Sequence, residues 1–204
     1  QDYPMEKKIK IYYNKLWIPT MNKDSAYYYR LVKFKQRNVP NGIVSDFYIS
    51  GEKLKNFYAT YLGISEKGID SIKRSGPLNE FNFNGQKSYT SSTFDGMLVG
   101  EEVSYFPDGG VKFRRNYVND SINGEETVYF PSEIVKTKKN WVNGVQQNEE
   151  INYYDDGMVE NRKFYLNGLQ HLNEIGYYRS GIVEYRLGWL GGLQNGKEIY
   201  YFET

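Results

Sequence analysis

Residues 153–177 read YYDDGMVENRKFYLNGLQHLNEIGY, and this stretch decides the fold. It opens with two aromatic residues and the turn signal Asp155-Asp156-Gly157, runs to a second turn signal at Asn167-Gly168, and returns to a tyrosine. Gly, Asn and Asp supply the backbone conformations that tight turns need, and the runs between them favour strands. No helical period of 3.6 residues crosses the region. The stretch therefore predicts one β-hairpin of 24 residues.

The same pattern recurs every 24 residues from about residue 81 onward. Aromatic residues at this spacing are Phe81, Tyr105, Tyr129, Tyr153, Tyr177 and Tyr201, and a second set midway is Tyr117, Trp141, Tyr165 and Trp189. Three further sets share the register: Glu102, Glu126, Glu150, Glu174 and Glu198; Arg114, Lys138, Arg162 and Arg186; and Val111, Val135, Val159 and Val183. Such periods mark stacked supersecondary units. We predict an all-β fold, an elongated antiparallel β-meander of 24-residue hairpin repeats.

Equal periods would align equivalent residues in rows across the sheet. A three-residue turn after Tyr105-Phe106 would place Glu102 opposite Arg114, and a two-residue turn would place it opposite Arg115, so both pairings stay open. We predict an alternating ladder of Glu and Arg or Lys on one face. Each exposed rung would contribute only about 0.2–1 kcal/mol, and its main effect would be to fix the strand register.

The chain divides into three parts by sequence. Residues 81–204 hold five 24-residue repeats, and residues 42–80 are a divergent repeat with an insertion that begins near residue 64. Residues 1–41 are an N-terminal β cap or leader, with strands expected at 9–13 and 28–35. A repeat array needs such a cap because a free edge strand invites aggregation.

Over about residues 81–204 these units resemble the bacterial MORN-repeat variant family. The resemblance rests on units such as Trp141-Val142-Asn143-Gly144 followed by Glu150 and Tyr153-Tyr154. It implies an elongated antiparallel array without catalytic residues of its own. It also implies a role in scaffolding or protein contact, with membrane association among eukaryotic relatives.

Composition excludes several function classes. The chain has no Cys and one His, so disulfides, Cys-ligated metals and multi-His metal sites are excluded. We expect no enzyme activity, no catalytic residues, no metal and no cofactor. The net charge of +1 gives no reason to expect nucleic acid, and no apolar run has the length of a transmembrane helix. Because the chain starts at Gln1, we expect export to the periplasm or cell envelope after removal of a signal peptide; a cytoplasmic location stays open.

The aromatic and basic rows are the candidate binding surface. Packing of one ring on another is the simpler interpretation, and a platform for a partner is the functional one. The candidate binding residues are Tyr105, Tyr129, Tyr153, Tyr177, Trp141, Trp189, Arg114, Lys138, Arg162 and Arg186. We expect a non-catalytic binding or scaffolding module that contacts a protein; the alternative is a glycan-binding envelope protein. His171 is expected to be a polar turn residue.

Overall fold

The computed structural model describes residues 8–36, 38–65 and 68–204 of the chain. Nearly every described element is an antiparallel strand, and the described helical content is one 3-10 turn, η1 (Lys23–Ser25). The chain divides into two compact units, here called unit 1 (residues 1–100 and 107–109) and unit 2 (residues 101–106 and 110–204). The predicted all-β meander of antiparallel hairpins is confirmed, and each unit is described by itself.

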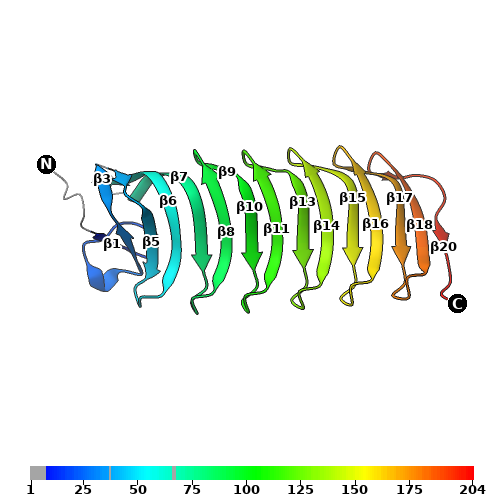
Figure 1. The fold of residues 1–204 in the computed structure, drawn as a ribbon, viewed down its shortest axis with the longest axis horizontal. Helices are drawn as coiled ribbons and strands as arrows, with labels where there is room; N and C mark the ends of the chain where they lie inside the picture. The colour runs from blue at the N-terminus through cyan, green and yellow to red at the C-terminus, as the bar shows by residue number, and fades with distance from the viewer. Residues whose placement is uncertain (1–7, 37, 66–67) are drawn as a thin grey trace. The chain divides into compact units, whose positions relative to one another are not determined.

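Unit 1 contains the strands that precede the regular repeats (Figure 1). Its strands are β1 (Ile9–Tyr13), β2 (Tyr28–Val32), β3 (Phe34–Gln36), β4 (Val39–Pro40), β5 (Ile43–Tyr48), β6 (Lys53–Ser65), β7 (Gly68–Phe81), β8 (Lys87–Phe94) and β9 (Met97–Leu98). Antiparallel pairing runs in the order β1, β2, β5, β6, β7, β8 and β9, while β3 and β4 pair with each other. The predicted strand at 9–13 is present, and the one at 28–35 is split into β2 and β3.

The core of unit 1 lies between these strands. Val32, Val44 and Leu62 are fully buried and form one cluster with Phe34, Phe57 and Leu78. Beside this cluster, the guanidinium of Arg30 donates two hydrogen bonds, of 2.6 and 2.8 Å, to the carboxylate of Asp46. Both side chains are almost completely buried, at 1% and 0% exposure.

Unit 2 contains the regular hairpins. Its strands are β10 (Gly100–Tyr105), β11 (Val111–Val118), β12 (Ser121–Ile122), β13 (Gly124–Tyr129), β14 (Val135–Val142), β15 (Val145–Tyr153), β16 (Val159–Leu166), β17 (Leu169–Tyr177), β18 (Val183–Leu190), β19 (Leu193–Gln194) and β20 (Ile199–Tyr200). From β13 to β18 each strand pairs with the next in chain order.

The 24-residue period of the sequence is also a period of the backbone. Glu126 pairs with Lys139 and, 24 residues later, Glu150 pairs with Lys163. The next equivalent pair is Glu174 with Leu187. A register shift follows each of these pairings at the same relative place, just before Tyr129, Tyr153 and Tyr177.

The turns repeat as well. Tyr154 N–H donates to the Met158 carbonyl at 2.8 Å, and equivalent bonds of 2.7 to 2.8 Å close the turns that follow Phe106, Phe130 and Tyr178. At the opposite end of the hairpins, Asn143 and Asn167 have positive φ angles of 49° and 52°. Such conformations match the twist of two-residue hairpin turns, which explains the Asn-Gly signal in the sequence.

In unit 1 the same type of turn occurs at Tyr48–Glu52 and Asn82–Gln86, where the first residue's N–H bonds the last residue's carbonyl. These turns are 34 residues apart, ten more than the later period, and the long hairpin β6–β7 lies between them. The boundaries expected at residues 41 and 80 stay predictions. Residues 1–7 and 37 of the expected cap and 66–67 of the expected insertion lie outside the described residues.

Candidate functional site

Unit 2 carries two charged ladders, one on each face of its sheet. Strand alternation explains this, because neighbouring residues such as Arg114 and Arg115 point to opposite faces. In β11 the less exposed residues are Val111, Phe113, Arg115 and Tyr117, and the exposed residues alternate with them. The expectation of a single Glu–Arg/Lys ladder on one face was therefore wrong.

The buried ladder consists of Glu102, Glu126, Glu150 and Glu174 with Arg115, Lys139 and Lys163. Arg115 binds Glu102 and also approaches Glu126 at 3.4 Å, which decides between the two pairings left open for Glu102. Lys139 lies 3.9 Å from Glu150, and Lys163 lies 3.9 Å from Glu174. Glu102, Glu150 and Glu174 are only 5 to 7% exposed, so these rungs are not the surface contacts that the sequence suggested.

Polar side chains from the same hairpins complete the buried ladder. The Trp141 indole donates to Glu126 at 3.0 Å, and the Tyr185 phenol donates to Glu174 at 3.0 Å. Gln146 and Gln170 donate to Glu150 and Glu174 at 2.7 and 2.8 Å. Burial, reinforced by the charge of Glu174, raises the pKa of Tyr185 above its ordinary value. These carboxylates are engaged in holding hairpins together, because buried charges require such partners.

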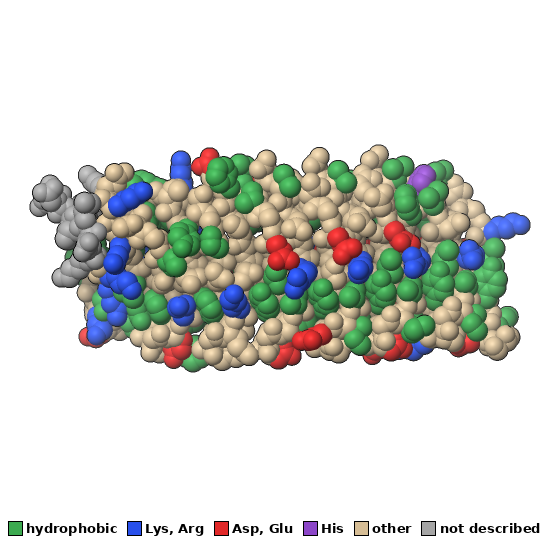
Figure 2. Space-filling model, in the orientation of Figure 1, with side chains coloured by type: hydrophobic (Ala, Val, Ile, Leu, Met, Phe, Trp, Pro, Cys, Tyr) green, Lys and Arg blue, Asp and Glu red, His purple; other side chains and the backbone are tan. Residues whose placement is uncertain are grey.

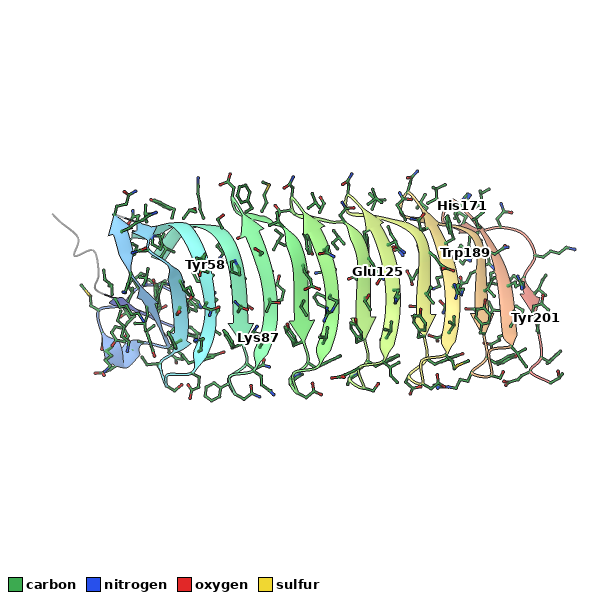
Figure 3. The ribbon with its side chains drawn as sticks, viewed as in Figure 1. Tyr58, Lys87, Glu125, His171, Trp189 and Tyr201 are labelled. Carbon is green, nitrogen blue, oxygen red and sulfur yellow. The ribbon has the colours of Figure 1, made fainter. Side chains whose placement is uncertain are left out.

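The exposed ladder consists of Glu101, Glu125 and Glu149 with Arg114, Lys138 and Arg162. The three ion pairs measure 3.4, 3.9 and 2.9 Å, and all six side chains are 40 to 53% exposed. Figure 2 shows them as red and blue side chains that recur along unit 2, and Figure 3 labels Glu125. Arg186 continues the basic row, but residue 173 in the acidic row is Asn173.

The predicted tyrosines accompany the exposed ladder. The pKa of Arg162 is raised, first by its hydrogen bond from the guanidinium to Glu149, and also by the nearby phenols of Tyr177 and Tyr153. Tyr105, Tyr129, Tyr153 and Tyr177 are all half-buried. One edge of each ring set therefore stays accessible beside a charged pair. A band of hydrophobic side chains runs next to the charges in Figure 2.

The predicted tryptophans belong to the other face. Trp141 hydrogen-bonds Glu126 of the buried ladder. Trp189 alternates with Tyr185 and Leu187 along β18, which places it on that face too. The structure thus groups four tyrosines with the basic row and separates Trp141 and Trp189 from them.

Sequence reasoning missed an aliphatic edge at the Asn-Gly turns. Val142 pairs with Val145, Leu166 with Leu169, and Leu190 with Leu193 across these turns. All six are exposed by 40% or more. The signal was present, since Val118, Val142, Leu166 and Leu190 are also 24 residues apart.

His171 was expected in a turn but lies in strand β17, opposite Phe164. The turn is shorter than expected and ends before residue 169. Among the described residues, no group of three or more His, Cys, Asp or Glu side chains is placed to hold a metal ion. The part of the chain that the structure describes contains no helix with the length and apolar character to cross a membrane.

Comparison with known proteins gives no relative for this chain. No protein-family model matches it, and no curated protein matches it.

Proposed function

We propose that the chain is a non-catalytic binding or scaffolding module that contacts a protein partner through the exposed ladder and its tyrosines. The observation that carries the proposal is the repetition of one exposed unit, an ion pair beside a half-buried tyrosine, in successive hairpins. Tyr and Arg are enriched in protein interfaces because they combine a large contact area with directional polar groups. The resemblance to MORN-repeat variant proteins supports the same function.

The difference between the two ladders supports this choice of surface. The carboxylates of the buried ladder already accept hydrogen bonds from Trp141, Gln146, Gln170 and Tyr185. The exposed ladder has only its own ion pairs, and exposed pairs contribute little to stability. A partner can replace these pairs at low cost, whereas it would have to break a packed network on the other face.

A protein partner and a glycan make different demands on the rings. Sugar binding needs ring faces open for stacking, whereas the tyrosines of unit 2 expose only part of each ring beside charged groups. This favours a protein with alternating charges of its own. Titration of the chain with a panel of soluble glycans, followed by Tyr and Trp fluorescence, separates the two. We expect no saturable response; a saturable response that is lost in Tyr153→Ala would favour the glycan.

A further inference from the structure

A hollow of about 360 Å³ opens in unit 1 between β7, β8 and β9. Ile72, Leu78 and Leu98 supply apolar walls, and Arg74, Ser91 and Thr93 supply polar groups. Leu78 belongs to the buried core cluster, and Ile72 packs against it. The hollow is therefore an indentation beside a packed core.

The hollow arises where small side chains occupy positions that are large in the later hairpins. Leu78 pairs with Ser91, and 48 residues later the equivalent pair is Glu126 with Lys139. Ser91 thus stands where Arg115, Lys139 and Lys163 recur. Thr93 stands where the aromatic set Tyr117, Trp141, Tyr165 and Trp189 recurs. The regular repeat would fill this space with a long cation and an aromatic ring, and here both are absent.

Polar atoms without partners face this space. The Ser91 hydroxyl is buried without a hydrogen-bond partner, and the residue is 6% exposed. The Nε of Arg74 is also buried and unpartnered. Thr93 has only a long, 3.5 Å bond to the Gly76 carbonyl. Buried donors without acceptors are costly, so a missing acceptor is the simplest explanation of their arrangement.

Arg74 is held in place by its surroundings. Its guanidinium carbon lies 5.2 Å from the centre of the Phe57 ring. No carboxylate is among the described residues that line the hollow. A single guanidinium with one fork of donors suits one carboxylate, and the apolar walls suit a hydrocarbon body. A phosphate dianion would need a second cation, and none of the described lining residues provides it.

We propose that this hollow binds a small carboxylate with a short apolar body, whose carboxylate accepts hydrogen bonds from Arg74 and Ser91. The hydrocarbon part would contact Ile72, Leu78 and Leu98. The site is separate from the exposed ladder and does not depend on the function proposed above.

Calorimetric titration of the full chain tests the site with three probes: hexanoate, hexan-1-ol and inorganic phosphate. We expect saturable binding of hexanoate, with hexan-1-ol and phosphate each weaker by at least about tenfold, because each lacks one half of the recognition. Arg74→Gln should weaken hexanoate by at least about tenfold. Ser91→Ala should weaken it as well, while Ser92→Ala, the neighbouring serine on the other face of β8, should leave it unchanged.

Thr93→Tyr provides a variant that blocks the site and keeps the fold, because tyrosine occupies this register position at Tyr117 and Tyr165. It should abolish hexanoate binding with an unchanged circular dichroism spectrum. Equal binding of hexanoate and hexan-1-ol, equal binding of phosphate, or full binding by Thr93→Tyr would overturn the proposal. Absence of hexanoate binding up to its solubility would overturn it too.

Discussion

The phenol of Tyr154 donates a 2.8 Å hydrogen bond to the backbone carbonyl oxygen of Tyr177. Twenty-four residues later, Tyr178 makes the same 2.8 Å bond to the carbonyl of Tyr201. Each bond connects one hairpin to the next. The aromatic spacing in the sequence is therefore a spacing of contacts between hairpins as well as of strands.

Replacing Tyr154 by Phe should lower the free energy of unfolding by about 1 kcal/mol, because it removes a partly buried hydrogen bond and keeps the ring. Tyr178→Phe is the matched control, since its equivalent bond is exposed, and it should change the free energy by less than about 0.5 kcal/mol. Urea unfolding of both variants gives the two values. Equal losses would show that burial does not set the strength of this bond.

The turn of the second regular hairpin contains a residue under backbone strain. Glu133 has a φ of 65°, whereas Gly157 and Gly181 occupy the equivalent place in the next two hairpins. Its N–H still bonds the Phe130 carbonyl at 3.0 Å, so the turn has kept its geometry without glycine. A left-handed conformation costs a non-glycine residue roughly 1–2 kcal/mol.

Glu133→Gly should therefore raise the free energy of unfolding by about 0.5–1 kcal/mol, after the larger entropy of glycine in the unfolded chain is included. Gly157→Ala is the reverse experiment and should be destabilising by about 1 kcal/mol. A Cβ at Gly157 would meet only Ile134, at 3.7 Å, so its cost reflects backbone strain alone. A destabilising Glu133→Gly would refute this explanation of the turn.

Much of the fold followed from the sequence because its period is strict. The turn residues and aromatic positions placed β10 to β18 correctly, including the strand Val111–Val118. The faces were harder to predict. Arg114 and Arg115 are both basic, and only the register shows that Arg115 pairs with the buried Glu102. The hollow beside Arg74 depends on small residues that break the period, and their effect appears only when the register is known.

Alkaline pH should destabilise the protein. Burial is the first cause that raises the pKa values of Tyr13, Tyr117, Tyr165 and Tyr185, and the charge of Glu174 adds to it at Tyr165 and Tyr185. A phenol with a raised folded-state pKa loses its proton first in the unfolded chain. Its stabilisation is complete below about pH 10 and is lost as the pH rises through the folded-state value.

The urea midpoint should consequently fall between pH 9 and pH 11, by roughly the range in which phenols ionise. The fall should be smaller in Tyr185→Phe, which lacks one of these phenols. Burial lowers the pKa of Lys55, which works in the opposite direction, since stability then increases as the pH rises toward 10.5. A midpoint that rises steadily to pH 11 would mean that Lys55 outweighs the tyrosines.

The buried pair in unit 1 should respond strongly to removal of one partner. Asp46→Ala leaves the guanidinium of Arg30 buried without its carboxylate and should cost about 3–5 kcal/mol. Replacement of both residues, Arg30→Met with Asp46→Leu, should recover most of that loss, because no charge is then left unpaired. Chemical unfolding measures both. A double variant as unstable as Asp46→Ala would indicate that the pair itself contributes the stability.

The central claim is that the exposed ladder is the surface that a protein partner recognises. Reversing two rungs, Glu125→Lys with Lys138→Glu and Glu149→Arg with Arg162→Glu, keeps each ion pair and the net charge but inverts the order of charges. The matched control reverses the pair Arg179–Asp155, which measures 2.7 Å and lies at a turn.

The most direct measurement is quantitative affinity purification from the native host with three baits: the unmodified chain, the reversed ladder and the reversed turn pair. We predict that a protein captured by the unmodified chain is also captured by the turn control, and that the reversed ladder captures at least about tenfold less of it, since misplaced like charges cost several kcal/mol at an interface. Equal capture by all three baits would contradict the claim.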